Sequence, residues 1–188
     1  MAIDYYYKLP RVDISNIKGC EYAKELTREE ILDDKKRKEI IREIKANCDN
    51  GYFWVLLGKN SQTDDKWVCL QCASSKNIAS EIAADIKCML PIDENDDILW
   101  NSHFHKGVFR AEYARNIRCQ KYRDMLDKFP VMCFVIIDHE KFLSDTDTGG
   151  YGRLDYAETK FAYDTQSLYW KPIKDQYKVL KILESGCN

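Results

Sequence analysis

The feature that most constrains the fold is a dense apolar run at residues 52–57, Tyr-Phe-Trp-Val-Leu-Leu in sequence. Turn-forming residues at 48–51 come directly before the run, and Gly58 follows it. Aromatic and β-branched residues between turn residues are typical of a buried strand. A second strand-like run, residues 66–72, follows a polar loop at residues 59–65. The two runs together predict an antiparallel hairpin.

Helical patterns lie on both sides of this hairpin. Thr27 and Glu30 have the spacing of a capping box, which predicts a helix over residues 27–46. The charged stretch at residues 33–39 within it is interpreted as a solvated face with internal ion pairs. After the hairpin, Ser74 or Ser75 can cap a second helix that ends before Pro91. Residues 1–26 show no clear period.

The second half of the chain repeats this alternation. Helix formers dominate residues 108–128, a strand is expected at residues 131–137, and residues 145–152 form a turn-rich loop. Two further helices are expected at residues 154–169 and 174–183. The prediction is an α/β (α+β) fold with a small, mainly antiparallel three-stranded sheet flanked by helices. Residues 1–48 are expected to be an N-terminal helical extension packed on a core of residues 49–188.

Composition limits the classes of protein that remain. Apolar residues make up 45% and charged residues 32%, as in globular proteins. There are eight cysteines but no basic-then-apolar secretory pattern at the start, so we expect reduced thiols and a cytoplasmic location. No apolar run approaches the roughly 20 residues that cross a bilayer, so no membrane span is expected. The net charge of −2 means that nucleic-acid binding would depend on a local basic patch.

Several familiar sites are excluded by sequence. The serine-hydrolase elbow, the P-loop and the zinc-protease helix motif do not occur. Cys69 and Cys72 form a CxxC pair, and His103 and His105 could in principle complete a zinc site. Residues 69 and 72 of one regular strand point to opposite faces, however, so we interpret these cysteines as packing thiols and do not expect zinc.

The segment 106–128 is locally basic, with seven basic and three acidic residues. At about 100° per residue, Arg110, Lys121 and Lys128 fall nearly in line along a helix. Such a row suits the phosphates of a nucleic-acid backbone, although an ordinary solvated helix face explains it equally well. The candidate nucleic-acid contacts are Lys106, Arg110, Arg118, Lys121 and Lys128.

The other informative position is Glu158, in the predicted helix 154–169. Its carboxylate can stabilise the helix N-terminus, or it can serve as an oxygen ligand for a magnesium ion that polarises a phosphodiester. An alternative treats Asp155, Glu158 and Lys160 as the acidic and Glu-x-Lys residues of a PD-(D/E)xK-type nuclease. That alternative needs a strand, because a helix turns Glu158 and Lys160 about 200° apart.

These elements resemble the GIY-YIG nuclease superfamily over residues 51–172. Residues 51–53, Gly-Tyr-Phe, stand at the first motif, and residues 71–78 resemble the second motif with its Ser and Asn-Ile continuation. Glu158 resembles the metal-binding glutamate, and residues 169–172 resemble the terminal turn. Four family positions are substituted, at Phe53, Gln71, Glu81 and Lys171.

The resemblance implies a role for each matching residue. Glu158 would hold Mg2+ or Mn2+, an arginine would stabilise charge on the phosphate, and a tyrosine would help to deprotonate the attacking water. Because Phe53 cannot titrate, Tyr52 or Tyr113 would replace the family tyrosine, and Arg110 resembles the helical arginine of the restriction-enzyme branch. The candidate catalytic residues are Arg110, Glu158, Tyr52, Gln71 and Tyr113.

Two principal functions follow from this resemblance. The first is a metal-dependent endonuclease that hydrolyses phosphodiesters, most naturally in DNA. The second is a catalytically silent relative that acts as a binding or interaction module. The sequence leaves DNA against RNA preference and oligomeric state open.

Overall fold

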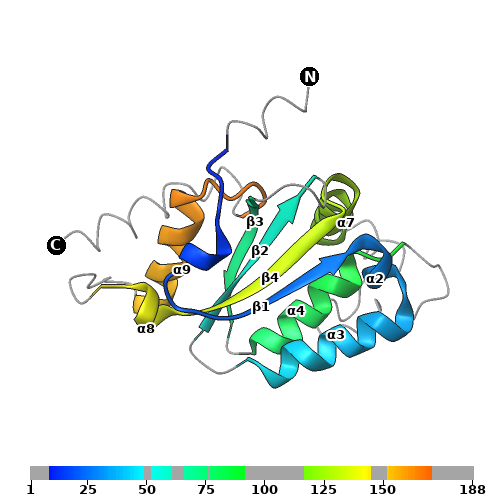
Figure 1. The fold of residues 1–188 in the computed structure, drawn as a ribbon, viewed down its shortest axis with the longest axis horizontal. Helices are drawn as coiled ribbons and strands as arrows, with labels where there is room; N and C mark the ends of the chain where they lie inside the picture. The colour runs from blue at the N-terminus through cyan, green and yellow to red at the C-terminus, as the bar shows by residue number, and fades with distance from the viewer. Residues whose placement is uncertain are drawn as a thin grey trace.

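A computed structural model describes residues 9–48, 52–60, 66–75, 77–91, 117–144 and 152–170 (Figure 1). Its centre is a four-stranded antiparallel sheet with the strand order β1-β4-β2-β3. The strands are β1 (Cys20–Thr27), β2 (Tyr52–Lys59), β3 (Val68–Ser74) and β4 (Val131–Asp138). The predicted hairpin is β2 and β3, and the predicted strand at residues 131–137 is β4. The mixed α/β class and the antiparallel sheet are therefore confirmed.

The prediction of three strands is wrong, because the N-terminal segment adds β1 to the edge of the sheet beside β4. Burial alternates only weakly along β1. Glu21, Ala23 and Glu25 are exposed, the residues between them are half-buried, and Leu26 is the only fully buried residue of the strand. An edge strand with one solvated face has few apolar residues to reveal its period of two. The first 48 residues thus contribute a strand as well as helices.

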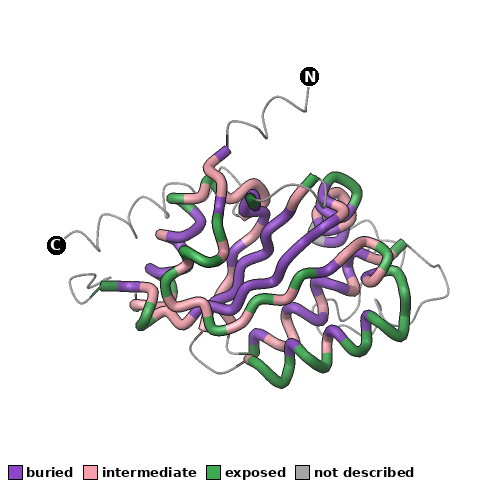
Figure 2. The backbone as a smooth tube through the Cα atoms, in the orientation of Figure 1, coloured by how far each residue is buried: buried purple, intermediate pink, exposed green. Residues whose placement is uncertain are grey.

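Helices cover both faces of the sheet (Figures 1 and 2). On one face, α2 (Arg28–Leu32), α3 (Asp34–Ala46), α4 (Ile78–Cys88) and α7 (Ile117–Lys128) bury what we call the α3-side core. On the other face, α8 (His139–Phe142), α9 (Arg153–Asp164) and the N-terminal segment around η1 (Ile14–Asn16) bury the α9-side core. In β2, Trp54 and Leu56 face the α3 side, and Phe53 and Val55 face the α9 side.

The helix predicted over residues 27–46 is two helices. The capping box of Thr27 and Glu30 starts α2 as predicted. Asp33, however, is both the C-cap of α2 and the N-cap of α3. The Asp33 side chain accepts a hydrogen bond from the backbone N–H of Lys36 at 2.9 Å. A side chain that caps a new helix competes with continuation of the old one, which explains the break.

Two other helix boundaries also differ from the prediction. Asn77, rather than Ser74 or Ser75, caps α4 by accepting from the backbone N–H of Ser80. The helix predicted to reach residue 169 ends at Asp164, and the chain then returns to the sheet over residues 165–170, which we call the return segment. The first part of the predicted helix 108–128 and all of the predicted helix 174–183 lie outside the described residues.

The expectation that Cys69 and Cys72 point to opposite faces is wrong. The register of β2 and β3 shifts between Leu56 and Leu57, so that β3 carries one extra residue there. This β-bulge interrupts the alternation of side chains. Both cysteines therefore lie in the α9-side core, with their sulfur atoms 3.6 Å apart. In the part of the chain that the structure describes, no helix has the length and apolar character of a membrane span.

Candidate functional site

Glu158 lies on α9 at the junction of three elements. Its side chain is buried, with 8% of the residue exposed. Oε2 accepts hydrogen bonds from the backbone N–H of Ser74 at 2.9 Å and from its hydroxyl at 2.7 Å. Oε1 accepts from the indole N–H of Trp170 at 2.8 Å. Both carboxylate oxygens are thus occupied by donors from the end of β3 and from the return segment.

Phe53, at the position that resembles the first-motif tyrosine of the GIY-YIG superfamily, lies next to Ser74 in the sheet. It is paired with Ser74 across the β2–β3 ladder and is fully buried. Its ring packs edge-on against Phe142 and Phe161, with ring centroids 5.5 and 6.0 Å apart. Phe161 follows Glu158 by three residues on α9 and so lies one helical turn away. The fold brings these positions together, but the phenyl ring offers no hydroxyl beside the carboxylate.

The other candidate catalytic residues do not gather around Glu158. Tyr52 packs against the α3-side core, on the face of the sheet away from α9. Gln71 lies at the β-bulge, and among the described residues its buried Oε1 has no hydrogen-bond partner. Arg110 and Tyr113 lie outside the described part of the chain, as do Lys106, His103 and His105. Arg118 belongs to α7, but its side chain is not described.

The geometry of α9 contradicts the PD-(D/E)xK alternative. Residues 155, 158 and 160 are helical, so Glu158 and Lys160 point about 200° apart. Lys160 pairs instead with Asp164 at 3.2 Å near the surface. Asp155 is exposed, whereas Glu158 is buried. The three side chains therefore do not converge on one ion.

In the described residues the Glu158 carboxylate contacts the donors of Ser74 and Trp170. Mg2+ takes near-octahedral oxygen ligands at about 2.0–2.1 Å, and the described contacts of Glu158 offer its own carboxylate and the Ser74 hydroxyl. Within the described ranges, no three His, Cys, Asp or Glu side chains form a group that could hold a metal ion. The buried Glu158 carboxylate thus connects α9 to the end of β3 and to the return segment through hydrogen bonds.

Two of the predicted nucleic-acid contacts, Lys121 and Lys128, form hydrogen bonds with Tyr169 of the return segment. The Lys121 ammonium donates to the backbone carbonyl of Tyr169 at 3.4 Å and lies 5.0 Å from the Tyr122 ring centroid. The Lys128 ammonium pairs with Asp124 at 2.8 Å, and the Tyr169 hydroxyl donates to the same carboxylate. These two cations therefore have partners within the chain, and no described geometry presents them as an open row.

A longer cationic row lies on α3, although one of its members, Lys38, also pairs with Asp34 at 2.6 Å. At 100° per residue, four basic side chains occupy a sector of about 80°, roughly opposite the buried Ile40 and Ile44. We call these four exposed residues the α3 ridge: Lys35, Lys38, Arg42 and Lys45. Figure 2 shows the outer side of α3 as exposed along its length. From Lys35 to Lys45 the row spans about 15 Å.

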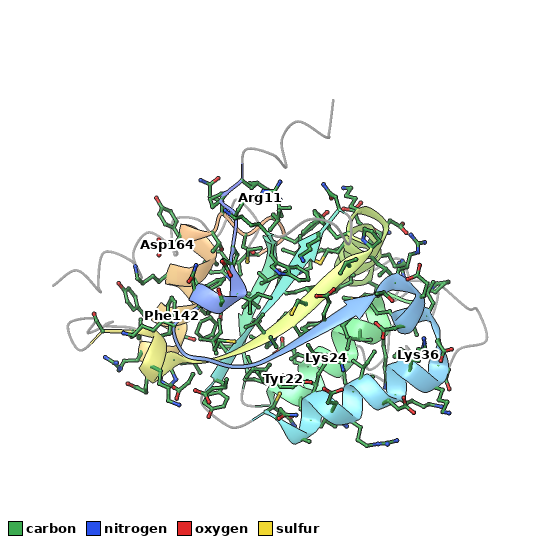
Figure 3. The ribbon with its side chains drawn as sticks, in the orientation of Figure 1. Arg11, Tyr22, Lys24, Lys36, Phe142 and Asp164 are labelled. Atoms are coloured by element: carbon green, nitrogen blue, oxygen red, sulfur yellow. The ribbon has the colours of Figure 1, made fainter. Side chains whose placement is uncertain are left out.

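Two of the three acidic residues of α3, Asp34 and Glu43, accept hydrogen bonds from neighbouring side chains. Asp34 accepts from Arg37 and Lys38, and Glu43 accepts from the Lys24 ammonium at 2.6 Å and the Tyr22 hydroxyl at 2.8 Å. Figure 3 shows Tyr22 and Lys24 on β1, next to α3. The hydrogen bonds from Lys24 and then Tyr22 lower the pKa of Glu43 below its usual value.

Charge is distributed unevenly between α3 and the rest of the chain. Helix α3 has six basic and three acidic residues, a net charge of +3, whereas the whole chain carries −2 and the remainder therefore −5. The prediction that residues 33–39 form a solvated face with ion pairs is confirmed for Asp34 and Lys38 but is wrong for Arg37, which is buried and donates to the backbone carbonyl of Ile31 at 2.8 Å. The 100° spacing of a helix over residues 27–46 already places these four basic residues on one side, so the ridge could have been found from the sequence.

Searches against protein-family models, curated proteins and solved structures find no match for this chain.

Proposed function

We propose that this chain is a nucleic-acid-binding module with a GIY-YIG-like arrangement that does not use Glu158 for phosphodiester hydrolysis. The observation that supports this most directly is the burial of the Glu158 carboxylate, which accepts three hydrogen bonds from Ser74 and Trp170. A general base has to be reached by water and by the substrate, whereas only 8% of Glu158 is exposed. Phe53 supports the same proposal, because its phenyl ring stands at the position of the family tyrosine and cannot take a proton from the attacking water.

The GIY-YIG-like part of the proposal is supported by the order of elements. An antiparallel hairpin, β2 and β3, is followed by helices, then by β4, which pairs with β2, and then by α9 with its glutamate. Phe53, Ser74 and Glu158 meet although they come from three separate segments. The N-terminal segment with β1, α2 and α3 lies before the region of resemblance.

The α3 ridge supports nucleic acid as the partner. Four exposed cations on one side of a helix match a polyanion better than they match an acidic protein pocket, because phosphates repeat along a strand at regular intervals. Each cation that meets a phosphate releases condensed counterions, so binding of this kind weakens steeply as salt rises. The proposed contact is to the phosphate backbone and carries no base sequence specificity.

The first test measures fluorescence anisotropy of a labelled DNA duplex with the full chain over a range of salt concentrations. If the four ridge cations each meet one phosphate, the slope of log K against log salt is about −3.6. Replacing Lys38 and Arg42 by Gln is expected to reduce the magnitude of that slope by about 1.8. The matched control replaces Lys18 and Lys66, two exposed lysines on the α9 side, and should leave the slope unchanged.

The second test incubates the chain with supercoiled plasmid and Mg2+ or Mn2+. We expect salt-sensitive retention of the plasmid without nicking. Nicking that disappears in a folded Glu158→Gln variant would replace this proposal by the metal-dependent endonuclease. Absence of both nicking and binding would also overturn it and would indicate a protein partner. Binding that is equally strong in the ridge variant would place the contact elsewhere on the chain.

A further inference from the structure

Cys88 and Cys119 form a buried thiol pair between two helices. Cys88 is the last residue of α4, and Cys119 lies in the first turn of α7. Their exposed fractions are 2% and 0%, and their sulfur atoms are 2.9 Å apart, with Cys119 donating to Cys88. A disulfide has an S–S distance of about 2.05 Å, so the two atoms need to approach by roughly 0.9 Å.

This pair differs from the other close pair of cysteines in the described residues. Cys69 and Cys72 lie on one strand, three residues apart, and their sulfur atoms are 3.6 Å apart. Their backbone is held by the β2 ladder and by the return segment, which donates from Leu168 to the Cys69 carbonyl. Cys88 and Cys119 instead belong to two separate helices, α4 and α7.

We propose that Cys88 and Cys119 are a site of disulfide formation and that a peroxide is the oxidant. One sulfur attacks a peroxide oxygen, the O–O bond breaks, and a sulfenic acid and one water form. The second sulfur then attacks the sulfenic sulfur, the S–S bond forms, the S–O bond breaks, and a second water leaves. The two thiols together lose two electrons and two protons, and one hydrogen peroxide becomes two waters.

Burial determines the rate and the selectivity of this reaction. Because both sulfurs are inside the α3-side core, oxidation requires local opening of the contact between α4 and α7. Hydrogen peroxide is small enough to use such an opening, and the second thiol is already in place to trap the sulfenic acid. A bulky thiol reagent, which cannot be enclosed in the closed core, should react more slowly with this pair.

The disulfide would close a covalent loop through the chain. Thirty residues lie between Cys88 and Cys119, and this segment contains Lys106, Arg110 and Tyr113. Constraining the unfolded chain over a loop of this length is expected to lower the unfolding equilibrium constant by two to three orders of magnitude, or about 500-fold. The crosslink therefore stabilises the packing of α4 on α7 under oxidising conditions.

The experiment treats the reduced, folded full chain with hydrogen peroxide, unfolds it and alkylates the remaining thiols. The expected result is an intact mass lower by two hydrogens, two fewer alkylated cysteines, and a tryptic peptide that joins Cys88 to Cys119. The unfolding midpoint in urea should rise and return to its first value after reduction. Alkylation of all eight cysteines after treatment, or a linkage that joins other cysteines instead, would overturn the proposal.

Matched variants separate this pair from its neighbours. Cys88→Ala and Cys119→Ala should each abolish the crosslink and the rise in midpoint, whereas Cys69→Ala with Cys72→Ala should retain both. If a core variant does not fold, the linkage map of the natural sequence still decides the question. A crosslink without any rise in the midpoint would overturn the expected effect on α4 and α7.

Discussion

Replacing Glu158 by Gln tests whether this residue stabilises the fold or is kept for chemistry. The carboxylate accepts three hydrogen bonds on two oxygens, whereas an amide has only one oxygen. If that oxygen faces Ser74, the amide N–H2 faces the Trp170 indole N–H, donor against donor. An unpaired buried donor costs about 1–3 kcal/mol, so we expect Glu158→Gln to lower the free energy of unfolding by that amount.

The assay is urea unfolding at neutral pH, followed by far-UV circular dichroism so that tryptophan changes do not affect the signal. The midpoint should fall while the slope of free energy against urea stays constant, because the surface exposed on unfolding is the same. A charge maintained only for catalysis behaves in the opposite way, since its removal commonly leaves stability unchanged or raises it. Equal or greater stability of Glu158→Gln would therefore refute the structural role.

A double-mutant cycle with Trp170→Phe assigns the loss to the named contact. Trp170→Phe alone removes the indole donor to Oε1 of Glu158. In the Glu158→Gln background the same change removes the donor conflict, so it should cost less. We expect a coupling energy of about 1 kcal/mol between the two positions, and additivity would indicate that the hydrogen bond contributes nothing.

The remaining predictions concern the stability of the fold at Glu43 and Gly58. Because the hydrogen bond from Lys24 lowers the pKa of Glu43 from 4.5, the contribution of Glu43 to stability is complete above that value and is lost as pH falls through the lowered pKa. The difference in urea midpoint between the natural sequence and Glu43→Gln should shrink between about pH 6 and about pH 3, and a constant difference would contradict this. At Gly58 an added Cβ would lie 2.7 Å from Leu70 Cδ1 and 2.8 Å from Phe129 Cγ. Gly58→Ala should cost about 1–3 kcal/mol in the same urea assay, and a neutral result would show that the ring can move.

The parts of the fold with strong local signals were predictable from the sequence. The buried strands β2 and β4 are continuous apolar runs, and the capping box at Thr27 starts α2 where expected. Strand β1 was missed because it is an edge strand with one solvated face. The break at Asp33 was missed because an aspartate within a charged run gives no apolar signal for a new cap.

The candidate site depended on contacts that are distant in the sequence. Glu158 stood out as a carboxylate near a helix start, but its partner Ser74 lies 84 residues away. Its burial could not be read from the helical period alone, since it lies beside the apolar face. The proximity of Cys69 to Cys72 similarly follows from a β-bulge, which local alternation does not predict.

The most direct test of the central claim is a crystal structure of the full chain soaked with Mn2+, whose anomalous scattering locates the ion. We predict no manganese on the carboxylate at position 158, with the Ser74 and Trp170 donors still bonded to it. An ion bound there, with the indole of Trp170 displaced, would contradict the structural role of Glu158 and restore metal-dependent hydrolysis as its function.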